Sequence, residues 1–330
     1  MRSFLALFVA GLLVSQTAGA AVCIGKNCEL IDLAARAAGL SLNQILTEID
    51  RNIVDPIVDN QRSIASWEGG MLQFTPRGSE GSVKVTLWGG GAWRYVDISN
   101  TMLGASVNFG YYTGNSSLSL GVEIPFDKKT DLILNGAFWS GPSDYGSGIS
   151  QENMKETSGR FGLGIRQKFY STGIADAFVL GGFVIGHRES DITLEGTTIA
   201  IRYPGGRITW KGEEKYSEKS TYVSTPVLLG ASFNLPWITL TVSGGGSVIF
   251  QQGRISLSKW GPVGPYGGYY NVGAASDRDT TGFTLVPMVS LGAETGLERG
   301  PSLTMNFRPG FGNFPMGGSV GLGWKFLVSK

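Results

Sequence analysis

The chain has 330 residues, of which 42% are apolar, so it can bury a core and is not a largely disordered protein. Only 16% of the residues are charged and 50 are glycine, whereas an average soluble domain has roughly 25% charged residues and ~7% glycine. Lys and Arg number 27 against 26 Asp and Glu, which leaves no positive excess for a nucleic-acid partner. One histidine and two cysteines exclude a zinc site rich in these ligands, and we expect neither a metal nor a cofactor.

The first 20 residues have the features of a secretory signal peptide. Arg2 is followed by the apolar run 4–14, and Ala18-Gly19-Ala20 provides a cleavage site. The apolar run is too short to span a bilayer as a helix, which takes about 20 residues. We therefore expect an exported protein, cleaved after Ala20.

Residues 21–60 form a second unit with helical periodicity. Two amphipathic patterns, 29–38 and 42–54, predict a helical hairpin of net charge −3. Cys23 and Cys28 precede it, and in an exported chain we expect them to form a disulfide. The hairpin could plug the interior of the following domain or rest in the periplasm against a partner.

From about residue 69 to the C-terminus, apolar residues alternate with Gly, Ser, Asn and scattered charges. Val83, Val85 and Leu87, for example, alternate with Lys84 and Thr86. Long strands with one apolar and one polar face are typical of a barrel with lipid outside and water inside. We predict twelve strands, at about 69–77, 82–95, 101–112, 117–125, 130–139, 159–170, 176–188, 221–234, 237–250, 281–293, 301–308 and 318–328.

The spacing of these strands also favours a barrel in a membrane. Short turns at 126–129, 171–174, 234–237 and 295–300 alternate with long connections at 140–158, 188–221 and 251–280. Bacterial barrels have short periplasmic turns and long external loops. The connection 188–221 contains Pro204-Gly205-Gly206 between two strand-like runs, so we expect a hairpin projecting beyond the membrane.

The signal peptide, the N-terminal helical segment and the alternating strands together resemble the Gram-negative outer-membrane β-barrel superfamily. The resemblance covers residues 1–20 and about 69–330. It implies an all-β fold, a single antiparallel transmembrane barrel over 69–330 in the bacterial outer membrane. It also implies contact with outer-membrane lipid and with the barrel assembly machinery. The motif is architectural and does not identify a substrate.

The strand alternation predicts a cationic lumen with one acid, Glu123. Fixed charges in a narrow pore can select ions, so we expect an outer-membrane channel for small polar or anionic solutes. Alternatively, these side chains pair with acids and conduct nothing. The predicted pore-lining residues are Lys84, Arg94, Glu123, Arg160, Arg166, Lys168, Arg308 and Lys325.

The sequence is also compatible with two other functions. A non-conducting barrel could act in surface display or adhesion through its long loops, including 261–270. A lipid-modifying enzyme would have to depend on His187, the only histidine, with Ser190 and Asp191 nearby. Residues 187 and 190 fall on opposite faces of a strand, so they would not converge on one substrate. We therefore expect no catalytic residues and no enzyme activity.

Overall fold

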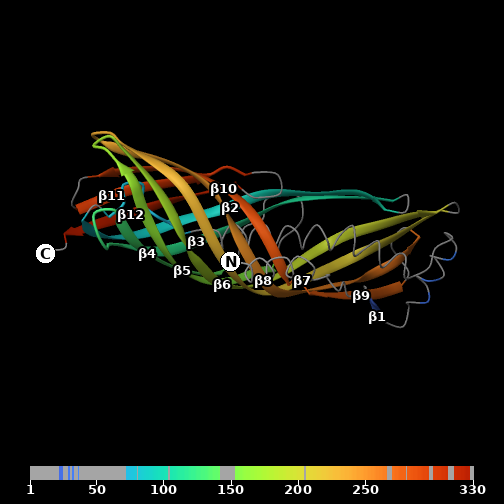
Figure 1. Ribbon diagram of the computed structural model, residues 1–330. Helices are drawn as coiled ribbons and strands as arrows, with labels where there is room; N and C mark the ends of the chain where they lie inside the picture. The colour runs from blue at the N-terminus through green and yellow to red at the C-terminus, as the bar shows by residue number, and fades with distance from the viewer. Residues whose placement is uncertain are drawn as a thin grey trace, which may run out of the picture.

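The computed structural model describes most of the chain after residue 71 (Figure 1). The described residues are 22–24, 29, 32, 36, 72–79, 81–102, 105–141, 153–203, 206–265, 270–279, 281–296, 300–310 and 316–327. No helix within these ranges is long and apolar enough to cross a membrane. The predicted signal peptide lies outside them, as does nearly all of the predicted helical hairpin, of which only Glu29, Asp32 and Arg36 are described. These regions stay predictions.

Long antiparallel strands make up almost all of the described chain. The N-terminal strand β1 is Val22–Ile24. The others are β2 Ser82–Met102, β3 Ala105–Pro125, β4 Thr130–Gly141, β5 Asn153–Ser171, β6 Ala175–Tyr203, β7 Gly206–Asn234, β8 Ile238–Pro265, β9 Tyr270–Asp279, β10 Gly282–Gly296, β11 Gly300–Arg308 and β12 Met316–Leu327.

Ten of the described strands close into a barrel. From β2 to β8 each strand pairs with the next, β8 continues to β10, β11 and β12, and β12 returns to β2. The closing pair runs from Met316 opposite Trp93 to Leu327 opposite Ser82. Closure leaves no unpaired edge around this part of the sheet, as a structure in hydrocarbon requires. The predicted antiparallel barrel is therefore confirmed.

The predicted number of twelve strands is wrong for two physical reasons. The first predicted strand, 69–77, is not formed: its described residues, 72–77, are not a strand and lie inside the barrel with 78 and 79. The predicted strands 101–112 and 117–125 belong to one strand, β3, because the polar stretch Gly114–Ser116 continues to pair with β2 instead of turning. Predicted short turns are present at 126–129, 172–174 and 235–237.

The alternation of side chains along the strands is as expected from the sequence. In β2, Ser82, Lys84 and Thr86 face the interior and are buried, whereas Leu87 is 49% exposed on the outside. Large apolar side chains cover the outer surface on every described barrel strand whose side chains are placed. They include Leu120, Phe161, Ile165, Phe183, Leu229, Val242, Leu285, Met305, Leu322 and Phe326. This apolar belt matches the surface that a bilayer requires.

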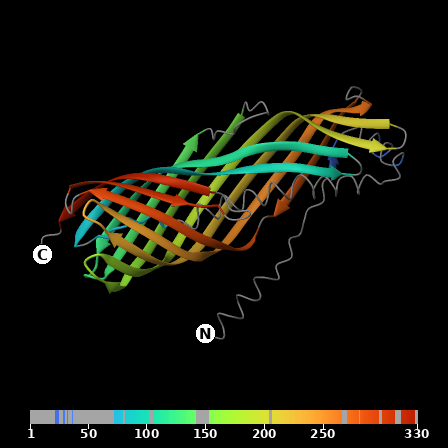
Figure 2. The same ribbon diagram turned by 90° about the horizontal axis from the view of Figure 1, so that it is seen from above.

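Strands β6, β7 and β8 continue far beyond the apolar belt (Figures 1 and 2). Their ladders extend to Tyr203 opposite Gly206 and to Ile208 opposite Pro265. The predicted hairpin around 204–206 is thus confirmed. β9 pairs with the outer half of β8, and β1 pairs with β9. We call the outer parts of β6, β7 and β8, together with β9 and β1, the external sheet.

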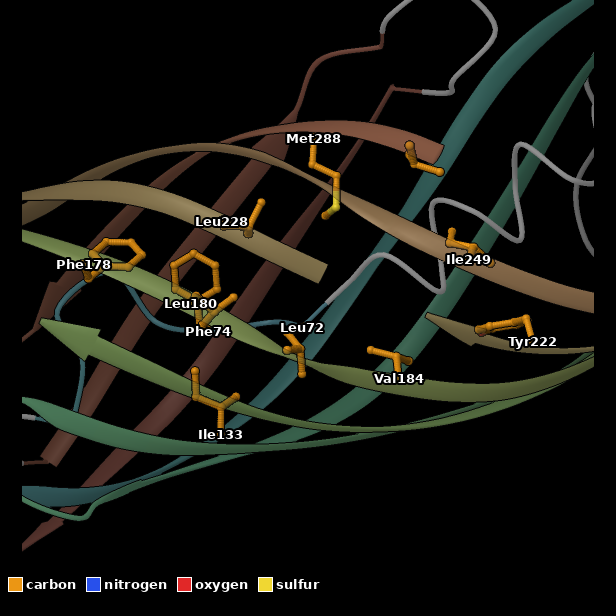
Figure 3. Packing of buried hydrophobic residues seen from close by; sticks show 11 residues of the cluster. Leu72, Phe74, Ile133, Phe178, Leu180, Val184, Tyr222, Leu228, Ile249 and Met288 are labelled. Atoms are coloured by element: carbon orange, nitrogen blue, oxygen red, sulfur yellow. The ribbon is translucent and has the colours of Figure 1, made fainter. Parts of the chain in front are cut away.

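An apolar cluster fills the middle of the barrel interior (Figure 3). Leu72 and Phe74 from the inserted segment pack among side chains of the barrel wall. The wall contributes Ile133, Phe178, Leu180, Val184, Tyr222, Leu228, Ile249, Val286 and Met288. Because this cluster is inside the barrel, the protein has a hydrophobic core where a porin would have an aqueous channel.

Candidate functional site

The candidate functional site is the barrel interior at the end with short turns, where residues 72–79 are inserted. Seven of the eight residues of this segment are buried, and only Arg77 is partly exposed. Leu72 fits against Gly162 and Gly164, where an added Cβ would lie 3.0 and 2.6 Å from its methyl carbons. Glycine at these wall positions therefore makes room for the segment.

Side chains of the barrel wall form hydrogen bonds with backbone N–H and C=O groups of the inserted segment, which is not paired with a strand. The Gln73 amide donates to Asn135 Oδ1 at 2.8 Å, and the Thr75 amide donates to Glu123. Ser232 donates to the Pro76 carbonyl at 2.8 Å. Buried backbone groups need such partners, since leaving one unsatisfied costs about 1–3 kcal/mol. The wall is therefore built to bind this segment.

Arg166 is at the centre of the network and is 1% exposed. Its guanidinium donates to Asp131 Oδ2 at 2.9 and 3.0 Å, to Glu123 Oε2 at 2.7 Å and to the Thr75 carbonyl at 2.5 Å. It also lies 5.7 Å from the ring centroid of Phe74. One residue thus links two wall strands, the inserted backbone and the apolar cluster above it.

Glu294 organises the opposite wall in the same way. Its carboxylate pairs with Lys84 Nζ at 3.3 Å and with Lys325 Nζ at 2.9 Å. It also accepts the Arg77 amide at 2.9 Å, and Lys84 donates to the Thr75 hydroxyl at 3.1 Å. The segment is therefore held on both sides by charged groups from β2, β3, β4, β5, β10 and β12.

Most of the predicted pore-lining residues do face the interior. Lys84, Glu123, Arg166, Arg308 and Lys325 are buried there. Arg160 and Lys168 are partly buried, and Lys168 pairs with Asp176 at 3.2 Å. Arg94 lies in β2 opposite Thr113, but its side chain is outside the described part of the structure. A selectivity role for these residues stays a prediction.

The expectation of a single acid in the interior is wrong for the described residues. Their buried charged side chains comprise five bases and five acids. The acids that the alternation did not reveal are Asp131, Asp176, Glu218 and Glu294. In β4 and β6, Ile133 and Phe178 occupy the interior face, so both faces of these strands are apolar and the alternation is ambiguous. Long-range pairing, such as Lys84 with Glu294, has no local sequence signal.

His187 lies on the outer surface of β6, just beyond the apolar belt. It contacts Thr221 Oγ1 at 2.9 Å and Glu189 Oε1 at 3.2 Å, and it is 45% exposed. Ser190 is buried on the opposite face of the strand, so the expected lack of convergence between the two is confirmed. The part of the chain that the structure describes has no cluster of His, Cys, Asp or Glu suited to a metal.

A polar pocket of about 710 Å³ surrounds His187 between β6, β7, β8 and β9. Its lining includes Lys219, Arg254 and Asp277. Arg254 and Ser256 donate to Asp277, and these hydrogen bonds, Ser256 first, lower the pKa of its carboxyl. The lining has two bases, Lys219 and Arg254, and two acids, Asp277 and Asp279. The pocket has no net charge that would favour an ionic ligand.

The disulfide between Cys23 and Cys28 stays a prediction. Cys23 lies in β1, but Cys28 is outside the described residues. The two alternatives for the predicted hairpin 21–60, a plug or a periplasmic unit, also stay predictions, because most of these residues lie outside the described part of the chain. The described segment that lies in the lumen is 72–79, most of which falls in the strand predicted at 69–77 in the barrel wall.

Comparisons with known proteins give structural similarity only. No protein-family model matches the chain, and no curated protein matches its sequence. Solved structures similar to it include the outer membrane protease OmpT from Escherichia coli, with 11% identity, 78% of this chain and 99% of that chain covered, and a TM-score of 0.41. Another is the translocator domain of the autotransporter NalP from Neisseria meningitidis, with 16% identity, coverage of 84% and 98%, and a TM-score of 0.38.

The assignment to a membrane follows from the barrel itself. It is closed, its outer surface carries an apolar belt, and its polar and charged groups face inward. The chain folds as a closed antiparallel β-barrel whose outer surface suits a lipid bilayer. Its short turns and Leu327, the last described residue, lie at one end, and the external sheet extends from the other. Barrels in the outer membrane have short periplasmic turns and long external connections, so we expect the external sheet to face the cell exterior.

Proposed function

We propose that the protein is a non-conducting outer-membrane barrel that acts through its external sheet. The observation that carries this proposal is the insertion of residues 72–79 into the lumen. An apolar cluster lies at mid-height and a network of ion pairs lies below it, so ions would meet two barriers in series. Moving an ion through a dry apolar region is expensive unless it is paired.

The size of the external sheet supports the same proposal. A transmembrane strand needs about 9–11 residues, whereas β6 and β7 have 29 each and β8 has 28. The strands outside the membrane are paired along most of their length. A chain that only needed a pore would not require this ordered surface, which is suited to contact with a partner outside the cell.

Conductance of the mature protein in a planar bilayer tests the first half of the proposal. The refolded wild type should carry no steady current, with folding confirmed by its heat-modifiable mobility in electrophoresis. Replacing Leu72 and Phe74 by alanine removes the apolar contacts of the inserted segment and should raise the frequency of brief openings. Steady, ion-selective current through the wild type would overturn the proposal and support a channel for small polar or anionic solutes.

Complementation of a deletion strain tests the second half. A variant that lacks residues 192–215 retains the barrel, because the removed part lies beyond the apolar belt. It should fail to restore the wild-type phenotype. The matched control is Arg160→Glu, which reverses a charge inside the lumen and should restore it fully. The reverse pattern, with only Arg160→Glu defective, would contradict action through the external sheet.

A further inference from the structure

We propose that the mature N-terminus lies on the outer surface of the cell, with strand β1 bound to the edge of the external sheet. The chain then enters the barrel from outside and reaches the short-turn end through the lumen. This inference rests on chain direction and is independent of whether the barrel conducts.

The pairing of β1 gives the first observation. Val22 lies opposite Ala275, Cys23 opposite Ala274 and Ile24 opposite Gly273, in antiparallel register. β9 itself pairs with β8 only over Arg254–Val263, whereas β10 takes over from Gln251 inward. β1 therefore belongs to the part of the sheet that lies beyond the apolar belt, and Figure 1 shows it at that end, beside β9.

The direction of the inserted segment gives the second observation. Ser79 lies at the short-turn end, where its carbonyl accepts the Ser82 amide at 2.8 Å and its hydroxyl donates to Asp131. Leu72 lies at mid-height among the glycines of β5 and β6. From Ser79 back to Leu72 the chain thus climbs away from the short turns. It heads for the same end of the barrel at which β1 is found.

The close fit around the segment excludes a return path through the described interior. Leu72 and Phe74 are buried among wall side chains, and the ion pairs of Arg166 and Glu294 close the space below them. Followed from Leu72 toward the N-terminus, the chain heads for the external end of the barrel. To reach the periplasm from there, it would have to pass through the lumen a second time. The described interior is already packed, so the external position of β1 is the simpler path.

The pairing of β1 with β9 also has a physical reason, which lies in the exposed edge of β9. β9 is the last long strand on its side of the external sheet, and an uncovered edge offers free N–H and C=O groups to other chains. Adding a strand satisfies such groups through main-chain hydrogen bonds. Here the chain's own N-terminus supplies the added strand for part of that edge.

Antibody binding to an epitope inserted directly before Val22 tests the proposal. Antibodies do not cross an intact outer membrane, so intact cells should be labelled as strongly as cells whose outer membrane has been permeabilised. The matched control carries the same epitope at Gly173 in the short turn between β5 and β6 and should be labelled only after permeabilisation. Labelling of the N-terminal epitope only after permeabilisation would overturn the proposal.

A cross-link tests the pairing of β1 with β9. Directly opposed residues of antiparallel strands have Cα atoms about 4.5–5.5 Å apart, within the range of a disulfide. With Cys28→Ser freeing Cys23, the variant Ala274→Cys should form a Cys23 disulfide, identified by mass spectrometry of the linked peptides. Gly273→Cys, one position along and on the other face, should not. Equal cross-linking at both positions, or none at 274, would contradict the register.

Discussion

Replacement of Arg166 by methionine should strongly destabilise the barrel, because it leaves two buried acids without their shared partner. Arg166 is 1% exposed and makes ion pairs with Glu123 at 2.7 Å and Asp131 at 2.9 Å. Removing one partner of a buried ion pair costs about 3–5 kcal/mol. The hydrogen bond to the Thr75 carbonyl, from a charged donor, adds about 1.5–3 kcal/mol. We therefore expect a loss of roughly 5 kcal/mol in the free energy of unfolding.

The assay is urea unfolding of the refolded protein in lipid vesicles, followed by tryptophan fluorescence. A triple variant, Arg166→Met with Glu123→Gln and Asp131→Asn, separates charge from packing. Removing all the charges of a buried network is often nearly neutral, so the triple variant should recover more than half of the loss. A loss below about 1 kcal/mol for Arg166→Met would refute the central role of this residue. A triple variant no more stable than the single one would show that packing dominates.

Three further outcomes follow from the geometry. Gly164→Ala should cost about 1–3 kcal/mol by overpacking against Leu72, and Leu72→Ala in the same chain should recover part of it; an effect unchanged by the second substitution would show that the contact is not the cause. Glu294→Gln leaves two buried lysines facing a neutral group and should lower the urea midpoint; an unchanged midpoint would contradict the pairing. In a carbon-detected NMR titration, the Asp277 carboxyl should titrate below the usual value near 3.9, because hydrogen bonds lower its pKa; the stability that it gives the external sheet is then present above about pH 3.9 and lost as the pH falls through the lowered pKa. Ser256→Ala should raise the midpoint of this titration, and a midpoint at or above about 3.9 in the wild type would count against the contact.

The alternation of apolar and polar residues was sufficient to predict the barrel and its inside face. Lys84, Thr86 and Leu87 point as expected because a strand between lipid and lumen imposes a period of two. The same alternation led to a wrong prediction for residues 72–77, which were expected to form a wall strand. Leu72 and Phe74 alternate with Gln73 and Thr75, since an extended segment inside a barrel also has an apolar and a polar environment on its two sides.

The chemistry of the interior could be predicted only in part. The bases were found because charged residues stand out among glycine and serine on the interior face. Their partners were missed because the pairing joins residues far apart in the chain, such as Lys84 with Glu294 and Arg166 with Glu123. Closure of the barrel brings them together, and closure has no local sequence signal.

The most direct test of this account is a cross-link between the inserted segment and the barrel wall. In a chain with Cys23 and Cys28 replaced by serine, Leu72→Cys is combined with Gly162→Cys, where the nearest neighbour of an added Cβ would be the Leu72 side chain. The matched control combines Leu72→Cys with Phe161→Cys, at a position where the native side chain is 48% exposed on the outer surface. We predict that a disulfide forms in the folded protein with position 162 and not with position 161. Absence of the disulfide at position 162, in a protein shown to be folded, would contradict a lumen closed by residues 72–79.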